Sequence, residues 1–404
     1  MSDLNSTPSA ERPHIGIFGK RNAGKSSIIN ALTGQNLAIV SEVKGTTTDP
    51  VYKAMELLPL GPVMIIDTPG LDDEGKLGKL RMEKAYQVLN KTDIALLIVD
   101  ATTGLAREDL NILAQIKAKR LNYLIVFNKC DLAPNFSLPK EELHYSIAVS
   151  AEQKTNIFEL KEKIAHLVPS DTMTKKIVGD LLEKDDFVVL VVPIDSAAPK
   201  GRLILPQQQT IRDVLEAKAN AIVVQTPQLA KTLQSLGKKP KMVITDSQAF
   251  AQVAKDTPED IFLTSFSILF ARYKGDLATA VAGARVLGTL KDGDKVLISE
   301  GCTHHRQCDD IGTVKMPNWV RHFSKAQPEF IFSSGTEFPR DLSPYKLIIH
   351  CGGCMLNEKE MQYRIAYAKS KQIPITNYGI AIAYMHGILE RSLRPFPAIA
   401  QLLA

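Results

Sequence analysis

The chain has 404 residues and a formal net charge of +5 that is spread along its length rather than collected in a tail. This length predicts roughly two to four domains, and the mild charge makes nucleic acid an improbable partner. No run approaches the roughly 18 apolar residues of a membrane span, and residues 1–12 lack the apolar stretch of a signal peptide, so we expect a cytoplasmic protein that enters no membrane.

The first part of the chain alternates strand-like apolar runs with helical patterns, after a flexible tail at residues 1–13. Such alternation predicts a parallel sheet with helices on both faces, the α/β class, and we place this domain at residues 14–169. A charged stretch at residues 170–186 indicates a linker. The strands of the first domain are expected at residues 14–18, 63–67, 95–100, 123–128 and 145–149.

Two further α/β domains with parallel sheets are expected, at residues 187–272 and 273–404. The former shows no catalytic constellation; the latter carries most of the cysteines. Ligands of open α/β sheets bind at the carboxyl ends of the strands, so residues that follow two such strands are expected to converge. The predicted strands are 187–193, 221–225, 242–245 and 261–264 in the middle domain, and 295–299, 329–332, 347–350 and 373–376 in the last.

A phosphate-binding loop follows the first strand, where residues 19–26 read GKRNAGKS and fit the pattern G-x-x-x-x-G-K-[ST]. Backbone N–H groups and the helix N-terminus would hold the phosphates, with Lys25 on the β and γ groups and the Ser26 hydroxyl on Mg²⁺. The expected phosphate-binding residues are Gly19, Asn22, Ala23, Gly24, Lys25, Ser26 and Ser27.

Three later strand ends carry residues that suit a guanine nucleotide. Asp67 is placed to meet Mg²⁺ through water, and the N–H of Gly70 to sense the γ-phosphate. The Asp131 carboxylate can accept from guanine N1–H and the 2-amino group, which adenine cannot match. The last strand would close over guanine O6 with a backbone N–H. The expected guanine-binding residues are Asn128, Lys129, Asp131, Ser150 and Ala151.

These four elements, in this order, resemble the translation-factor class of P-loop GTPases. The segment 45–49, GTTTD, is similar to the first switch of the tRNA-modification and ribosome-assembly GTPases, which implies that Thr47 reaches Mg²⁺ and the γ-phosphate. Leu71 stands where Ras-like proteins place a water-orienting Gln. The resemblance implies that Asn22 coordinates a K⁺ ion in place of an arginine finger. The implied catalytic residues are Lys25, Thr47, Gly70 and Asn22.

Three cysteines and two histidines near the end of the chain suggest a metal centre: Cys302, His304, His350, Cys351 and Cys354. Three thiolates can hold three corners of a 4Fe-4S cluster and leave one iron for an exchangeable ligand. Zinc is disfavoured by the uneven spacing and the odd thiolate number, and Cys351 with Cys354 could instead form a redox pair. Cys308 is a possible fourth thiolate, whereas Cys130 is expected to be structural.

Over residues 14–404 the chain resembles the FeFe-hydrogenase maturation GTPases, whose cluster domain is signed by C-x-H, a spacer of some fifty residues, and H-C-x-x-C. Here 45 residues separate His304 from His350. The likeness implies a middle dimerisation domain, a homodimer, and a scaffold or carrier that delivers the di-iron subcluster precursor to apo FeFe-hydrogenase. Radical-SAM maturases would act upstream.

Two other functions remain open from the sequence. A ribosome-associated or tRNA-associated GTPase with a structural zinc site explains the first half of the chain equally well. However, no RNA-binding module or basic aromatic stripe accompanies it. A GTPase switch that senses a cluster without carrying cargo would use the same residues.

Overall fold

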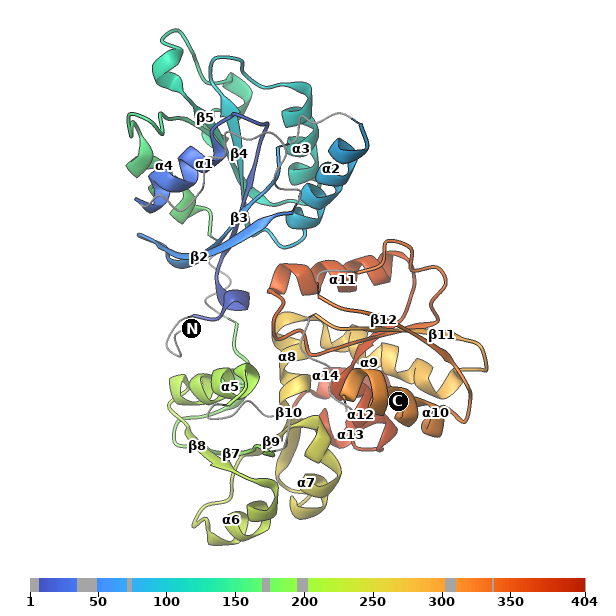
Figure 1. Ribbon diagram of the computed structural model, residues 1–404. Coiled ribbons are helices and arrows are strands. Elements are labelled where there is room, and N and C mark those ends of the chain that lie inside the picture. The colour runs from blue at the N-terminus through green and yellow to red at the C-terminus, as the bar shows by residue number, and fades with distance from the viewer. Residues whose placement is uncertain are drawn as a thin grey trace. The chain divides into compact units, whose positions relative to one another are not determined.

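The computed structural model describes residues 7–34, 49–70, 75–168, 175–194, 203–301, 310–335 and 338–403, with side chains throughout except at 75–80 (Figure 1). The chain divides into two compact units, residues 1–172 and 173–404. Each unit is an α/β structure, as the sequence predicted.

Unit 1 contains a six-stranded sheet in the order β2-β3-β1-β4-β5-β6. All neighbouring strands are parallel except β2, which runs antiparallel to β3 at one edge. The sequence analysis missed β2 because its side chains are mostly exposed and charged residues interrupt its apolar pattern. The strands are β1 (His14–Phe18), β2 (Val51–Leu57), β3 (Gly61–Asp67), β4 (Ile94–Asp100), β5 (Asn122–Asn128) and β6 (Ser146–Ala148).

Helices cover both faces of this sheet, because its central strands are apolar on both sides. Two separate buried clusters form the two faces of the core. One cluster includes α1 (Lys25–Thr33) and α4 (Ile157–His166); the other includes α2 (Gly75–Leu89) and α3 (Arg107–Ala118).

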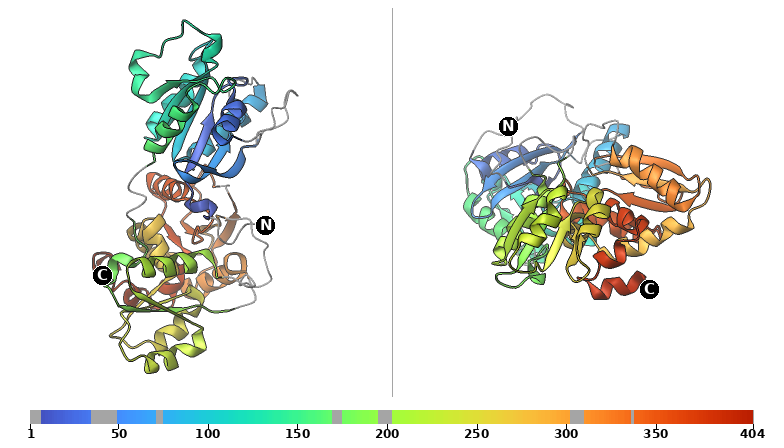
Figure 2. Two further views of the ribbon diagram at one scale, coloured as in Figure 1. Left: turned by 90° about the vertical axis from the view of Figure 1, so that its left-hand side faces the viewer. Right: turned by 90° about the horizontal axis from the view of Figure 1, so that it is seen from below.

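Unit 2 contains two four-stranded sheets, both entirely parallel, in the orders β10-β9-β7-β8 and β12-β11-β13-β14. Figure 2 shows them from two further directions. The first consists of β7 (Phe187–Val191), β8 (Asn220–Val224), β9 (Met242–Thr245) and β10 (Phe262–Ser265). The second consists of β11 (Lys295–Ser299), β12 (Glu329–Ser333), β13 (Leu347–His350) and β14 (Ile375–Asn377).

One hydrophobic core joins the two sheets of unit 2, and it runs across the domain boundary expected near residue 273. At Gly283 the helix α9 lies so close to β14 that a Cβ atom would come within 2.2 Å of the Ile375 carbonyl oxygen. The helices are α5 (Leu205–Glu216), α6 (Leu229–Ser235), α7 (Phe250–Asp256), α8 (Phe266–Lys274), α9 (Leu277–Ala284), α10 (Met316–Ser324), α11 (Glu358–Ser370), α12 (Tyr378–Met385), α13 (Leu389–Ser392) and α14 (Pro397–Ala400).

None of the helices in the described ranges combines the length and the apolar character that crossing a bilayer requires.

Candidate functional site

The phosphate-binding loop lies between β1, in the middle of the unit 1 sheet, and the start of α1. Two glycines shape it. Gly19 has φ +142°, and a Cβ there would lie 2.2 Å from the Ile98 carbonyl oxygen. Gly24 has φ +91° and is the N-cap residue of α1. Side chains rarely tolerate this left-handed backbone, so the loop needs glycine at both positions.

The remaining loop residues lie where the phosphate-binding pattern predicts. The Lys25 ammonium donates to the carbonyl oxygens of Gly19, at 3.0 Å, and Lys20, at 2.8 Å, so it arches over the loop. Ser26 and Ser27 occupy the first turn of α1, where free backbone N–H groups and the helix dipole favour an anion. Asn22 is exposed and has φ +61°, and Ala23 is buried.

Asn128 ties the phosphate loop to the guanine-binding segment. Its side-chain amide donates to the Ala23 carbonyl oxygen at 3.1 Å, and its carbonyl oxygen accepts from the Ala151 N–H at 3.1 Å. Lys129 donates to Asp100 at 2.5 Å. Asn128 and Ser150 are buried. One buried side chain therefore sets the distance between the parts that would hold the phosphates and the base.

Asp67 and Asp131 each have one buried carboxylate oxygen, Oδ1, without a hydrogen-bond partner among the described residues. Burial raises the pKa of Asp67, while Lys25 and Lys53 oppose that rise. An unpaired buried carboxylate oxygen is costly unless a ligand supplies its partner. Mg²⁺ near Asp67 and the guanine N–H groups at Asp131 would do so. The donor set fits GTP with Mg²⁺.

Gly70 follows β3 and ends the described range 49–70. Thr68, two residues before it, is held by its hydroxyl, which donates to the Ile17 carbonyl oxygen at 2.6 Å. Thr47 and Leu71 lie outside the described residues.

In unit 2 the strand ends that precede Cys302 and Cys351 in the sequence, those of β11 and β13, lie side by side. Ser299, which ends β11, pairs with His350, which ends β13, and the Cys351 N–H donates to the Ser299 carbonyl oxygen at 2.9 Å. The Gly301 N–H donates to Sγ of Cys351 at 3.0 Å. Cys302 is the next residue after Gly301. The convergence expected from the strand ends is therefore present up to the residue before Cys302.

The turn after β13 presents its backbone donors to sulfur. The Gly353 N–H lies 3.4 Å from Sγ of Cys351, which also receives the Gly301 N–H. Two N–H donors on one sulfur stabilise a thiolate, the form that binds iron or zinc. Burial raises the pKa of the Cys354 thiol, and the nearby Lys274 ammonium opposes that rise. This donor set suits a metal cluster bound through thiolates.

His350 is 1% exposed and both of its ring nitrogens are engaged inside the protein. Nδ1 lies 2.7 Å from the Cys351 carbonyl oxygen, and Nε2 lies 3.0 Å from Nη1 of Arg364. Burial, together with the Arg364 charge, lowers the pKa of His350 to about 3, so the ring is neutral. Since the guanidinium only donates, Nε2 accepts and the ring proton sits on Nδ1.

Charged residues that the sequence analysis did not single out surround these cysteines. Arg364 and Glu360 form a buried pair on α11, with Nε to Oε1 at 2.9 Å. Glu300 is buried and accepts from the Tyr378 hydroxyl at 3.1 Å. Lys274 is 4% exposed. No sequence pattern marked them, because charged residues are mostly exposed to water.

Of the five expected ligands, the described residues include His350, Cys351 and Cys354. Cys302, His304 and Cys308 lie outside the described residues, and no group of three metal-binding side chains occurs within the described ranges. Cys130, Cys351 and Cys354 are described, and none of them is in a disulfide. Cys130 lies in unit 1, in the short helix that follows Lys129.

Three family comparisons cover successive parts of the chain. Residues 14–129 match the 50S ribosome-binding GTPase family. Residues 177–275 match the hydrogen maturase F dimerization domain, and residues 278–395 match the hydrogen maturase F tetramerization domain. The two hydrogen maturase F matches together cover more than half of the chain.

Curated relatives match the GTPase part. The tRNA modification GTPase MnmE of Helicobacter acinonychis is 32% identical over 191 residues, which are 45% of this chain and 42% of the relative. GTPase Der of Wolinella succinogenes is 32% identical over 197 residues, 46% of this chain and 41% of the relative. The chain thus spans about two fifths of the length of these relatives. Among solved structures, Era of Aquifex aeolicus is 20% identical with a TM-score of 0.35, covering 55% of this chain and 98% of Era.

Proposed function

Because the chain belongs to the hydrogen maturase F family, we propose that it is a GTP-hydrolysing scaffold or carrier in FeFe-hydrogenase maturation. It would hold a 4Fe-4S cluster and deliver the di-iron subcluster precursor, its cargo, to apo FeFe-hydrogenase. Radical-SAM maturases are the proposed upstream partners. The proposed form is a cytoplasmic homodimer, in keeping with the dimerization and tetramerization domains for which the matching families are named.

One hydrogen bond carries the cluster part of this proposal, the Gly301 N–H to Sγ of Cys351 at 3.0 Å. It brings the segment that continues into Cys302 against the turn that holds Cys351 and Cys354. Cys302 directly follows Gly301 in the sequence, so this hydrogen bond supports a cluster shared by both segments. We assign these three cysteines as its ligands.

A cluster held by only three cysteines has one iron with an exchangeable position, to which cargo can attach and from which it can leave. His350 has both ring nitrogens engaged, so we assign it a supporting role. His304 is then the remaining histidine candidate for the exchangeable position. The backbone donors of Gly301 and Gly353 would hold negative charge on Cys351 while the cargo changes.

The nucleotide part of the proposal is supported by the geometry of unit 1 and, for Thr47 and Leu71, by the sequence alone. Ser26, Asp67 and Thr47 would hold Mg²⁺, Lys25 the β- and γ-phosphates, and Asp131 the base. With Leu71 in place of a water-orienting Gln, we propose that a K⁺ ion on Asn22 assists hydrolysis. GTP turnover would then adjust partner exchange rather than drive chemistry at the cluster.

The carrier role is tested by loading the reconstituted protein with the radical-SAM maturases, adding apo-hydrogenase and measuring hydrogen evolution. We expect activation by the wild-type protein and none by Cys354→Ala, which removes one cluster ligand. Affinity for both partners should also differ between GTP-bound and GDP-bound protein. A loaded protein that never activates the hydrogenase would contradict the carrier role, while leaving a sensor role open.

A further inference from the structure

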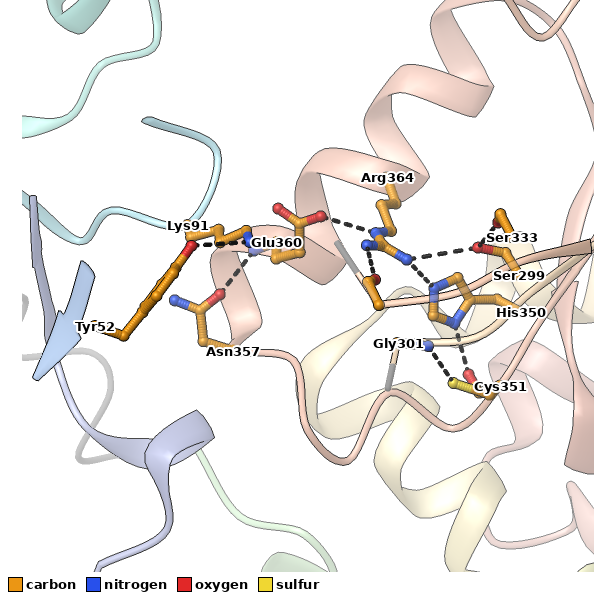
Figure 3. A network of polar contacts seen from close by, with 11 residues as sticks. Tyr52, Lys91, Ser299, Gly301, Ser333, His350, Cys351, Asn357, Glu360 and Arg364 are labelled. Atoms are coloured by element: carbon orange, nitrogen blue, oxygen red, sulfur yellow. Dashed lines mark hydrogen bonds and ion pairs between the residues drawn. The ribbon is translucent and has the colours of Figure 1, made fainter. Parts of the chain in front are cut away.

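Arg364 is fully buried in unit 2, and every nitrogen of its guanidinium has a partner (Figure 3). Nε donates to Glu360 Oε1 at 2.9 Å. Nη1 donates to His350 Nε2 at 3.0 Å and to Ser299 Oγ at 3.5 Å. Nη2 donates to the Gly335 carbonyl oxygen at 3.0 Å. A planar fork with fixed donors is well suited to hold several acceptors at set distances.

Two of these acceptors, Ser299 and His350, end the strands that precede cysteines in the sequence. Ser299 is the last residue of β11, three residues before Cys302. His350 is the last residue of β13 and immediately precedes Cys351. Arg364 therefore connects the starting points of both segments, in addition to the backbone pairing between β11 and β13.

The charge of Arg364 is balanced locally, which keeps the side chain in place. Glu360 lies one helical turn before it on α11 and is 3% exposed. The Asn357 side chain accepts from the Glu360 N–H at 3.1 Å and caps the helix there. The guanidinium lies over the Phe338 ring, 5.1 Å from its centroid. A buried pair of this kind tolerates the loss of neither partner.

The hydrogen bond from Arg364 also determines the tautomer of His350. Because Arg364 occupies Nε2 as a donor, the ring proton must be on Nδ1, where it is donated to the Cys351 carbonyl oxygen at 2.7 Å. That contact orients the first peptide of the turn whose Gly353 N–H points at Sγ of Cys351. The network thus extends from α11 to a cluster sulfur without a break.

We propose that Arg364 is a positioning residue for the cluster: through His350 and Ser299 it sets the separation and orientation of the strand ends that precede Cys351 and Cys302 in the sequence. The inference rests on the proposed cluster binding and extends it to a side chain that touches no iron. Partners that orient metal ligands from outside the coordination sphere commonly change metal affinity by about 10-fold to 100-fold when they are replaced.

Arg364→Lys tests this role, because it keeps the positive charge and removes the fork. Arg391→Lys is the matched control. Arg391 is a second largely buried arginine of unit 2, but it donates to the backbone carbonyl oxygens of Ala254, Thr257 and Pro258. Both proteins are reconstituted anaerobically with iron and sulfide. The readouts are the EPR spectrum of the reduced cluster and the rate of iron loss to a ferrous chelator, at a temperature where circular dichroism shows both to be folded.

We expect Arg364→Lys to lose iron at least about tenfold faster than wild type and to show shifted g-values, with Arg391→Lys like wild type in both. Wild-type spectra and iron loss in Arg364→Lys would overturn the positioning role. If Arg364→Lys does not fold, the same measurements on His350→Gln test the positioning role. That variant keeps an acceptor for Arg364 and loses the Nδ1–H contact, so an unchanged spectrum would again overturn the role. A wild-type protein that takes up no cluster would instead refute the proposed function.

Discussion

The nucleotide-binding edge of unit 1 and the cysteine edge of unit 2 both lie at the carboxyl ends of parallel strands. They differ in whether their buried charged groups have partners within the protein. In unit 1, Asp67 and Asp131 each keep a buried oxygen without a partner among the described residues. In unit 2, Arg364 and Glu360 satisfy each other and the strand ends around them. At the first edge a bound ligand can supply the missing polar partners. At the second edge the protein's own groups are paired, and they hold the strand ends next to the cysteines.

The contrast is sharpest at Asp131. Asp131→Asn replaces an acceptor for guanine N1–H and the 2-amino group by an amide, which leaves the 2-amino group facing a donor. We expect GTP affinity to fall by up to about 10⁴-fold, because a site built to pair a polar group rejects a mismatch strongly. Xanthosine triphosphate, with a carbonyl at C2, should bind better to the variant than GTP does.

Calorimetry with both nucleotides measures this change. Glu141→Gln is the control, since Glu141 is an exposed carboxylate of the same unit. Equal GTP affinity of Asp131→Asn and wild type would mean that the orphaned oxygen does not face the base.

A second variant disturbs the geometry of the first edge. In Gly24→Ala the new Cβ would lie 2.1 Å from Nδ2 of Asn128, at φ +91°. Displacing Asn128 separates the phosphate loop from the segment at Ala151, so we expect GTP affinity to fall by about 100-fold, equivalent to about 3 kcal/mol.

The control for Gly24→Ala is Gly61→Ala, which has the same left-handed strain at φ +84° but meets only Glu56 Oε1 at 3.6 Å. Both variants should lose thermal stability, and only Gly24→Ala should lose nucleotide affinity. If Gly24→Ala and Gly61→Ala lost GTP affinity equally, backbone strain alone would explain the effect.

The turn between Cys351 and Cys354 offers the equivalent test of the second edge. At Gly353, with φ +64°, a Cβ would lie 2.6 Å from Sδ of Met361, whereas at Gly352 nothing lies within 4 Å. In urea unfolding of the apoprotein we expect Gly353→Ala to cost about 1 to 3 kcal/mol and Gly352→Ala less than about 0.5 kcal/mol. Similar costs would show that the turn does not constrain unit 2.

The smallest expected effect concerns the proposed K⁺ ion. GTP hydrolysis should be about tenfold faster in K⁺ than in a matched Na⁺ buffer, since a cation at Asn22 supplies part of the charge that an arginine finger provides. Asn22→Ala should remove the difference between the two buffers and leave GTP affinity within about threefold of wild type. Equal rates in K⁺ and Na⁺ for the wild-type protein would rule out this role.

The sequence predicted the fold well because the buried strands carry a strong apolar signal. The strands 14–18, 242–245, 295–299 and 347–350 coincide with β1, β9, β11 and β13. The edge strand β2 was missed since it buries little. The loop motifs predicted Asp67 and Asp131 next to strand ends, where the structure has them, because these motifs depend on local spacing.

The buried polar residues beside Cys351 could not be predicted from such local patterns. Arg364 and Glu360 look like an ordinary surface ion pair at i, i+4 on a helix, and only the packing of α11 against the sheet that contains β11, β13 and β14 buries them. His350 belongs to the cysteine motif, yet both its ring nitrogens are engaged by protein groups. Membership in a motif predicted where that histidine lies, but not what it does.

We propose that three cysteines, which follow β11 and β13 in the sequence, hold one 4Fe-4S cluster. Anaerobic reconstitution with iron and sulfide, followed by EPR of the reduced protein, tests it most directly. We predict a 4Fe-4S signal in the wild-type protein and in Cys130→Ser, and its loss in Cys302→Ala, Cys351→Ala and Cys354→Ala. A stoichiometric zinc ion with no EPR signal, or a cluster signal that survives all three substitutions, would contradict the claim.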